Sequence, residues 1–235
     1  GMEAWLYDEE RWPSGSAGGL VTKEEAYRSM YLMMEKQMPE DRAKQIQEDT
    51  EKQIPEVGEK QTPDDRKEQM PEEQPVLVYA CRLDGTSYTG GRELAPGEMP
   101  SPEETVLSFY ARHPEGNDNY NGYTYLDTMS REAVQAYIRS THEAYKDACG
   151  NCFGQSIKGI FTDEPHRGGL FTNFSEGKEW AVPYTPALFG QFEERFGYDL
   201  REKLPELFLR KDGQELSKTT WDYVELCQEL FIERF

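Results

Sequence analysis

The first apolar segment of the chain is short, and acidic residues follow it at once. Residues 4–7 (AWLY) are apolar, Asp8, Glu9 and Glu10 come next, and a stretch rich in Gly and Ser covers residues 13–19. A short apolar run that ends at turn residues is typical of a buried strand. The pattern therefore predicts a strand that leads into an acidic, glycine-rich loop.

The next segment has the pattern of an amphipathic helix. Thr22 and Glu25 have the spacing of a capping box, in which each side chain satisfies a free backbone N–H at the helix start. Apolar side chains then recur at helical spacing, at Tyr27, Met30, Tyr31 and Met34. We therefore expect a helix within residues 22–34.

Two strands and a tight turn are predicted further along the chain. Residues 76–83 and 86–94 flank Asp84-Gly85, a dipeptide that favours the two-residue turn of a β-hairpin. Residues 105–112 (TVLSFYAR) alternate and then become apolar, as a strand does.

The C-terminal half alternates between helical and strand patterns. Ser130 is a good N-cap for a helix of about five turns, residues 157–162 (IKGIFT) form a short strand pattern, and a helix within residues 185–197 ends at a glycine. A final helix has a broad apolar face, formed by Trp221, Val224, Cys227, Phe231 and Phe235. The order strand, helix, strand, helix predicts parallel strands joined by crossover helices, an α/β fold.

A repeat interrupts this order. Residues 35–74 consist of five consecutive octapeptides: EKQMPEDR, AKQIQEDT, EKQIPEVG, EKQTPDDR and KEQMPEEQ. An eight-residue period matches neither an α-helix nor a coiled coil, and four of the units contain a proline. The composition predicts a disordered insertion, with a partner-binding arm as the alternative.

Charge and composition narrow the function. The 235 residues include 26 Lys and Arg against 45 Asp and Glu, a net charge of −19, which argues against nucleic-acid binding because such a surface repels phosphates. No apolar run reaches the roughly 20 residues that span a bilayer, so no membrane partner is expected. All 29 aromatic residues lie outside the repeat, and exposed aromatic rings stack on sugars, so a carbohydrate partner fits the composition.

The four cysteines suggest little chemistry. Cys149 and Cys152 form a CxxC motif, but Cys81 and Cys227 are isolated and the chain has three histidines, so a zinc site has weak support. We expect no metal and no redox role. Free thiols are typical of a reducing compartment, which favours the cytoplasm, and no signal-peptide pattern opens the chain.

The acidic residues after two predicted strands are the best candidates for chemistry. Asp163 and Glu164 follow the strand of residues 157–162, as Asp8 and Glu9 follow the first strand. In parallel α/β folds the active site forms at the C-terminal ends of the strands. Glycoside hydrolysis needs two carboxyl groups with separate roles, which these pairs could supply, although solvated loop acids remain the alternative. His166 would lie at the rim of such a site.

Four segments carry a resemblance to a known family. They are YDEERWPSGSAGG (residues 7–19), YLDTMSREAVQAYIRSTHEAY (residues 125–145), GIFTDEP (residues 159–165) and FGYDLREKLPELF (residues 196–208). In this order they resemble the catalytic region of glycoside hydrolase family 106, the bacterial α-L-rhamnosidases and their relatives. The first and third segments are the distinctive ones.

The resemblance implies a (β/α)8 TIM-like barrel that hydrolyses rhamnosides with inversion, within a longer protein that has further barrel strands and β-rich domains and sometimes depends on calcium. A complete barrel needs about 250 residues, more than the chain has outside its repeat. We therefore expect a partial barrel with a low-complexity insertion. Its first strand, loop and helix would lie in residues 2–34, the insertion in residues 35–74, and the remaining strand–helix units in residues 75–235.

The resemblance also suggests roles for the acidic loops. It implies that Asp8, Glu9 and Trp12 belong to one substrate-facing loop and that Asp163 and Glu164 belong to the next. We expect Glu164 and Glu9 to be catalytic, with Asp8 as the alternative to Glu9, and the acid and base roles stay open.

Substrate contacts are expected from Asp8, Trp12, Asp163 and His166. The chain is thus predicted to be a catalytic-domain segment of an α-L-rhamnosidase-like glycoside hydrolase. The alternative is a non-catalytic remnant that binds carbohydrate or a protein partner.

Overall fold

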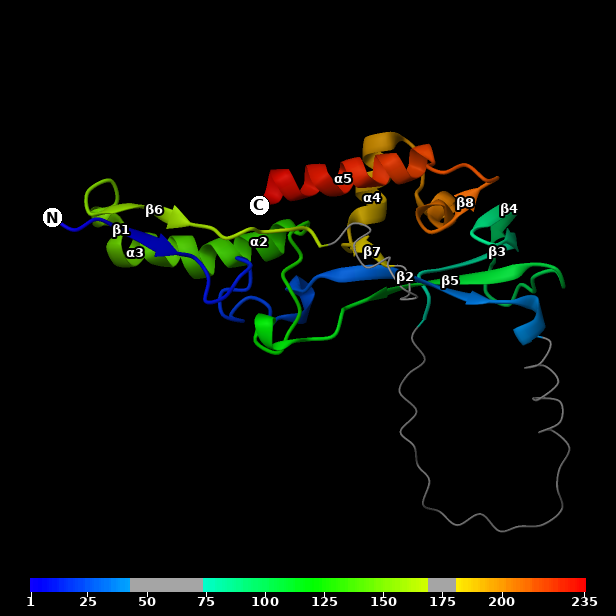
Figure 1. Ribbon diagram of the computed structural model, residues 1–235, viewed down its shortest axis with the longest axis horizontal. Helices are drawn as coiled ribbons and strands as arrows, with labels where there is room; N and C mark the ends of the chain where they lie inside the picture. The colour runs from blue at the N-terminus through cyan, green and yellow to red at the C-terminus, as the bar shows by residue number, and fades with distance from the viewer. Residues whose placement is uncertain (43–73, 169–180) are drawn as a thin grey trace, which may run out of the picture.

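The computed structural model describes residues 1–42, 74–168 and 181–235, which form two β-sheets and the helices that pack on them (Figure 1). A two-stranded sheet with its helices lies at one end of the molecule, and a six-stranded sheet lies at the other.

The six-stranded sheet is mostly antiparallel. Its order is β7-β2-β5-β3-β4-β8, and the pair β4–β8 is parallel whereas the other neighbours are antiparallel. The strands are β2 (Met30–Gln37), β3 (Leu77–Asp84), β4 (Ser87–Glu93), β5 (Thr105–Arg112), β7 (Ala181–Tyr184) and β8 (Arg210–Lys211).

The smaller sheet pairs two strands that lie far apart in the sequence. β1 (Ala4–Tyr7) runs parallel to β6 (Ile157–Phe161), with Tyr7 opposite Phe161 at the C-terminal ends. Gly159 makes this pairing possible, because a Cβ atom at that position would lie 2.5 Å from a ring carbon of Trp5. The indole of β1 therefore rests on the bare backbone of β6.

Helices follow strands at several points of the fold. α2 (Arg131–Ile138) continues through the π-helical segment η3 (Arg139–Glu143) into α3 (Ala144–Cys149), and α4 (Leu188–Phe196) and α5 (Lys218–Arg234) form a second pair. The short 3-10 segments are η1 (Glu25–Tyr27), η2 (Asp118–Tyr120), η4 (Gly150–Cys152) and η5 (Arg201–Leu207).

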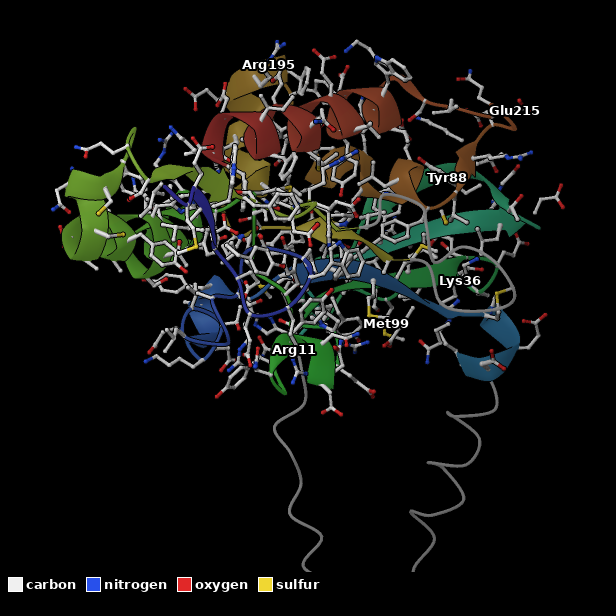
Figure 2. The ribbon with its side chains drawn as sticks, turned by 60° about the vertical axis from the view of Figure 1, so that its left-hand side comes forward. Arg11, Lys36, Tyr88, Met99, Arg195 and Glu215 are labelled. Atoms are coloured by element: carbon white, nitrogen blue, oxygen red, sulfur yellow. The ribbon has the colours of Figure 1, made fainter. Side chains whose placement is uncertain are left out.

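The main hydrophobic core lies between the six-stranded sheet and the pair α4–α5. Leu32 and Leu107 of the sheet, Phe192 of α4 and Tyr223 of α5 are fully buried in one cluster. Figure 1 shows both helices on the same side of the sheet. On the outer surface, Arg195 of α4 bonds to Glu225 and Glu229 of α5 (Figure 2).

The predicted TIM-like barrel is wrong. Among the described residues, two strand pairs, β1–β6 and β4–β8, are parallel, and four strands of the other sheet lie between β1 and β6 in the sequence, while β2, β3, β4, β5 and β7 pair antiparallel. The physical reason is clear at β3, β4 and β5. A tight turn joins β3 to β4, and residues 94–104, which form no helix, join β4 to β5, whereas parallel neighbours need a longer crossover connection.

The predicted helix of residues 22–34 is also wrong. The segment makes one 3-10 turn, η1, and then enters β2. The run MYLMM fits either period, and its burial alternates in the structure: Leu32 and Met34 are buried, whereas Tyr31 and Met33 are partly exposed. Pairing with β5 on one side and β7 on the other selects the strand.

Other local predictions are confirmed. Asp84 pairs with Ser87 across the turn of the β3–β4 hairpin, where Gly85 has a positive φ of 59°. The Ser130 hydroxyl caps α2 by accepting from the N–H of Ala133, and Gly197 ends α4. The apolar face predicted for the last helix is partly wrong, because Trp221 is 66% exposed.

The described part of the repeat is ordered against the sheet. Residues 35–37 complete β2, and Arg42 donates hydrogen bonds to the carbonyls of Ser101 and Glu104. β2 therefore continues across the boundary predicted at residue 35. Residues 43–73, and with them the predicted disorder of the repeat, lie outside the described residues, so the domain division stays a prediction.

Asp127 gives the fold a testable pH dependence. Burial raises the pKa of this carboxyl to about 6, above its usual range, although it accepts a hydrogen bond from the N–H of Met129. Because the folded state holds the proton more tightly, the contribution to stability is complete below about pH 4 and is lost as the pH rises through 6. Asp127→Asn keeps the acceptor oxygen and cannot ionise.

We therefore expect Asp127→Asn to raise the free energy of unfolding by roughly 1–3 kcal/mol at pH 8 and to change it little at pH 4. Urea unfolding at both pH values measures this. Asp118→Asn, at an exposed position, is the control. An equal loss of stability at both pH values would contradict the assignment.

Candidate active site at the ends of β1 and β6

The two acidic loops predicted from the sequence lie side by side. Both strands of the small sheet end toward the six-stranded sheet, and the loops that follow them meet there (Figure 1). Ser14 joins the loops: its N–H donates to the carbonyl of Asp163 at 2.9 Å, and its hydroxyl oxygen accepts from the N–H of Asp163 at 2.9 Å. The strand pairing therefore brings together residues 149 positions apart.

Asp8 is the buried centre of this junction. Its side chain is inaccessible to solvent. It accepts hydrogen bonds from the hydroxyls of Ser14 at 2.6 Å and Thr162 at 2.5 Å, and His142 Nε2 lies 3.4 Å from Oδ2. A buried carboxylate is stable only with such partners. The Asp8 carboxylate thus links β1 to the loop after β6 and to the π-helical segment η3.

Two tyrosines of α2 and α3 hold the C-terminal end of β1 in place. Tyr137 donates to the carbonyl of Asp8 at 3.2 Å, and Tyr145 donates to the carbonyl of Tyr7 at 2.7 Å. Ser14, Thr162, His142 and these tyrosines were not predicted as parts of the site, because their role arises from contacts between distant segments.

Glu9 holds the glycine-rich loop together. Its Oε2 atom accepts from the backbone N–H groups of Gly15, Ser16 and Ala17 at 3.0, 2.7 and 2.7 Å, and its Oε1 atom accepts from Gly18 at 2.7 Å. Successive N–H groups that converge in this way form an anion-binding nest. The arrangement favours a structural role for the Glu9 carboxylate over attack on a substrate.

Asp163 and Glu164 differ in accessibility. Asp163 is partly buried, and Oδ2 accepts from the hydroxyl of Tyr7 at 3.3 Å. Burial and, next, the Asp163 carboxylate raise the pKa of Tyr7, so the phenol stays a donor. Glu164 is exposed, and its backbone has a φ of +40°, a conformation that costs a non-glycine residue energy.

Trp12 and Glu164 form a direct contact between the two loops. The indole Nε1–H donates to Glu164 Oε2 at 3.0 Å, and Trp12 is 54% exposed. The loop of residues 113–125 is attached to the same region through Arg11, which donates to the carbonyl of Asp118 at 2.9 Å (Figure 2). An accessible carboxylate therefore lies beside an accessible indole.

His166 follows Glu164 by two residues in the loop after β6. Its ring stacks on Tyr125 with centroids 4.3 Å apart, and burial lowers its pKa. The N–H of Gly168 donates to Nδ1 at 3.0 Å, so the neutral ring carries its proton on Nε2. Tyr125 in turn donates to the carbonyl of Ser14 at 2.5 Å, which couples His166 to the junction of the acidic loops.

Two cavities adjoin the loop of Glu164. We call the first the tyrosine cavity; it has a volume of about 450 Å³ and includes Tyr31, Tyr120, Tyr125, His166 and Asn117 in its wall. The second, about 560 Å³, is lined mainly by apolar side chains together with His142 and Thr162: Val134, Tyr137, Ile138, Pro165 and Phe235. The sequence pattern indicated His166 but not the rest of the tyrosine cavity.

No group of three or more His, Cys, Asp or Glu side chains in residues 1–42, 74–168 and 181–235 could hold a metal ion. No helix in those ranges is both long and apolar enough to cross a bilayer. Cys81 and Cys227 are buried, and burial raises the pKa of their thiols to about 11 and about 12.

Comparisons with known proteins add no relative: no family model, no curated protein and no solved structure matches the chain. The resemblance to glycoside hydrolase family 106 therefore rests on its motif residues alone.

The nest around Glu9 yields a prediction. Glu9→Gln replaces one acceptor oxygen by an N–H₂ group that faces backbone donors. We expect the amides of residues 15–18 to exchange hydrogen about tenfold faster, as loss of roughly 1–2 kcal/mol of hydrogen bonding implies. Hydrogen exchange measured by NMR or mass spectrometry tests this. Glu10→Gln, one residue away and exposed, should leave these amides unchanged; unchanged exchange in Glu9→Gln would refute the structural role.

Proposed function

We propose that the chain is part of a glycoside hydrolase catalytic region of the α-L-rhamnosidase-like type, with its carbohydrate site at the ends of β1 and β6 and Glu164 as a catalytic carboxylate. The observation that carries the proposal is the hydrogen bond between Trp12 and Glu164, which joins the two acidic loops at an accessible edge. Both loops follow the C-terminal ends of the parallel strands β1 and β6, which supports a shared site for them.

Glu164 has the features that a reacting carboxylate needs. It is accessible, it is held by an N–H donor, and it occupies a strained backbone conformation of the kind that concentrates at functional positions. The indole donor restricts the carboxylate to one orientation, and an oriented acid or base is more effective than a mobile one.

Trp12 supplies the second element of a carbohydrate site. Its large exposed ring can lie against the apolar face of a sugar while its N–H holds Glu164. One side chain would thus position both the substrate and the reacting group.

The remaining acids support this edge in different ways. Asp8 and Glu9 are engaged by hydroxyl and backbone donors, so their part is to hold the loops in place. Asp163, next to Glu164 and bound to Tyr7, is the acid of the four that remains as the partner carboxyl group. Glycosidases separate the two groups by about 5–9.5 Å, depending on mechanism.

The engagement of Asp8 and Glu9 also favours a second candidate, a carbohydrate-binding region without turnover. Such a region needs the Trp12 surface but no second carboxylate. The first candidate hydrolyses an aryl glycoside and the second does not, whereas both bind sugar.

The first test is hydrolysis of aryl glycosides, including 4-nitrophenyl α-L-rhamnoside, by the full chain and by Glu164→Gln. We expect kcat to fall roughly 10²–10⁴-fold with little change in KM or Tm, because the substitution keeps the shape and removes the proton transfer. Glu194→Gln, on the exposed face of α4, is the matched control. Full kcat in Glu164→Gln would end the catalytic assignment, and sugar binding without turnover by the wild type would select the second candidate.

The second test separates the two roles of Trp12. Trp12→Phe keeps an aromatic ring and removes the donor, so we expect a lower kcat with a KM within about threefold of the wild type. Trp12→Ala removes both and should raise KM as well. Trp221→Ala removes a tryptophan of α5 that is even more exposed than Trp12 and should change neither kcat nor KM. Equal effects of Trp12→Phe and Trp12→Ala on KM would mean that the ring does not contact substrate.

A further inference from the structure

We propose that the tyrosine cavity binds a neutral pyranose ring and discriminates against sugars that carry a carboxylate. The proposal rests on the proposed function and deepens it, because it assigns a sugar-binding subsite and a specificity that the acidic loops alone do not give. The cavity is formed by residues of β2, of β5 and the loop of residues 113–125 that follows it, by His166 and by the first residue of β7. These parts are distant from one another in the sequence, apart from β5 and its loop.

Aromatic rings make one continuous wall of the cavity. His166 stacks on Tyr125 with centroids 4.3 Å apart, and Tyr120 packs on the other part of Tyr125 at 5.4 Å. Tyr125 is 4% exposed and is fixed by its bond to Ser14, so its part is to support the half-buried rings of His166 and Tyr120, which remain accessible. A rigid aromatic wall suits the flat C–H face of a pyranose.

Polar side chains at the cavity have the geometry that hydroxyl groups need. Asn117 Oδ1 accepts from the N–H of Asn119 at 3.0 Å, which orients the Asn117 amide and leaves its N–H₂ group as the donor side. Glu115, an acceptor, lines the same cavity, as does Thr124, whose hydroxyl donates to the carbonyl of Tyr125 and can accept from a ligand. The combination of planar polar groups with aromatic rings matches the alternating hydroxyl and C–H surfaces of a sugar.

The charges around the cavity favour a neutral ligand. Arg112 bonds to Glu35 at 2.8 Å and lies over the ring of Tyr110, so its charge already has a partner. His113 contacts the carbonyl of Ser29 through Nδ1 at 3.0 Å. Burial lowers the pKa of His166, which keeps that ring neutral. Glu115 adds a negative charge, and the net charge of the chain is −19, so a carboxylate ligand would meet repulsion.

The cavity is coupled to the proposed catalytic edge. His166 lines it and lies two residues after Glu164, and Tyr125 bonds to Ser14, whose backbone and hydroxyl hold Asp163. The volume of about 450 Å³ is within the range of small-ligand sites. A sugar in this cavity would therefore lie beside the loop that carries Glu164.

The experiment compares neutral sugars with their acids. Isothermal titration and saturation-transfer NMR of the full chain use L-rhamnose and the matched pairs D-galactose with D-galacturonate and D-glucose with D-glucuronate. We expect at least one neutral sugar to bind and any matched uronate to bind at least about tenfold more weakly. Binding of no neutral sugar, or tighter binding of a uronate, overturns the proposal.

Two variants locate the binding in the cavity. Asn117→Asp keeps the acceptor for Asn119 and replaces the donor by a charged oxygen, so we expect Kd for the neutral sugar to rise about tenfold. Asn119→Asp makes the same change two residues away, at an exposed position that does not line the cavity, and should leave Kd unchanged. Glu115→Gln, also exposed, should improve uronate binding severalfold. A neutral-sugar Kd unaffected by Asn117→Asp, or a uronate Kd unaffected by Glu115→Gln, argues against the cavity.

The outcomes separate this inference from the proposed function. Sugar binding that Asn117→Asp weakens, in a chain without hydrolysis, supports the cavity and refutes catalysis. Hydrolysis that depends on Glu164 but keeps its KM in Asn117→Asp supports catalysis and refutes the cavity as a subsite. Glu164→Gln should retain sugar binding, because Glu164 does not line the cavity.

Discussion

The buried carboxylate of Asp8 is the interaction on which the candidate site depends. A carboxylate with no solvent access needs polar partners. The fold supplies hydroxyl donors from the loop after β1 and from the loop after β6, and His142 Nε2 of η3 lies 3.4 Å away. A buried charge that lost one of these partners would be left uncompensated at high cost. The requirement to satisfy one anion therefore fixes the relative position of three segments, and with them the accessible residues Trp12 and Glu164.

Internal hydrogen bonds also hold the rest of the two acidic loops in place. Glu9 gathers the backbone N–H groups of the glycine-rich loop, and Ser14 uses its hydroxyl and its backbone to tie that loop to Asp163. Each of these bonds is internal to the loops, so the loops keep their shape without a ligand. The indole of Trp12 and the carboxylate of Glu164 stay accessible and are available to bind a ligand. A preorganised site needs such a rigid support beneath its accessible groups.

Sequence patterns predicted the parts of this protein that depend on neighbouring residues. Gly85 in its turn, the Ser130 cap and the Gly197 stop are local, and each was predicted from a few residues. The strand at residues 30–37 was not predicted, because the run MYLMM fits the helical period as well as the strand period. Pairing with β5 and β7, which are distant in the sequence, selects the strand. The sheet order depends on such pairings throughout, which is why the barrel prediction failed. At the site, the acidic loops were predicted from their place after strands, whereas the nest around Glu9, the role of Ser14 and the tyrosine cavity arise only when those loops meet.

Gly159 shows how far from the chemistry the geometry of this site is decided. The glycine lies in the middle of β6, and the ring of Trp5 occupies the space where a side chain would begin. Adding a single methyl group there would force β1 and β6 apart or displace the indole. The bonds among Asp8, Ser14 and Thr162 join the loops that follow those same two strands. The spacing of the two loops therefore depends on the absence of a Cβ atom at position 159.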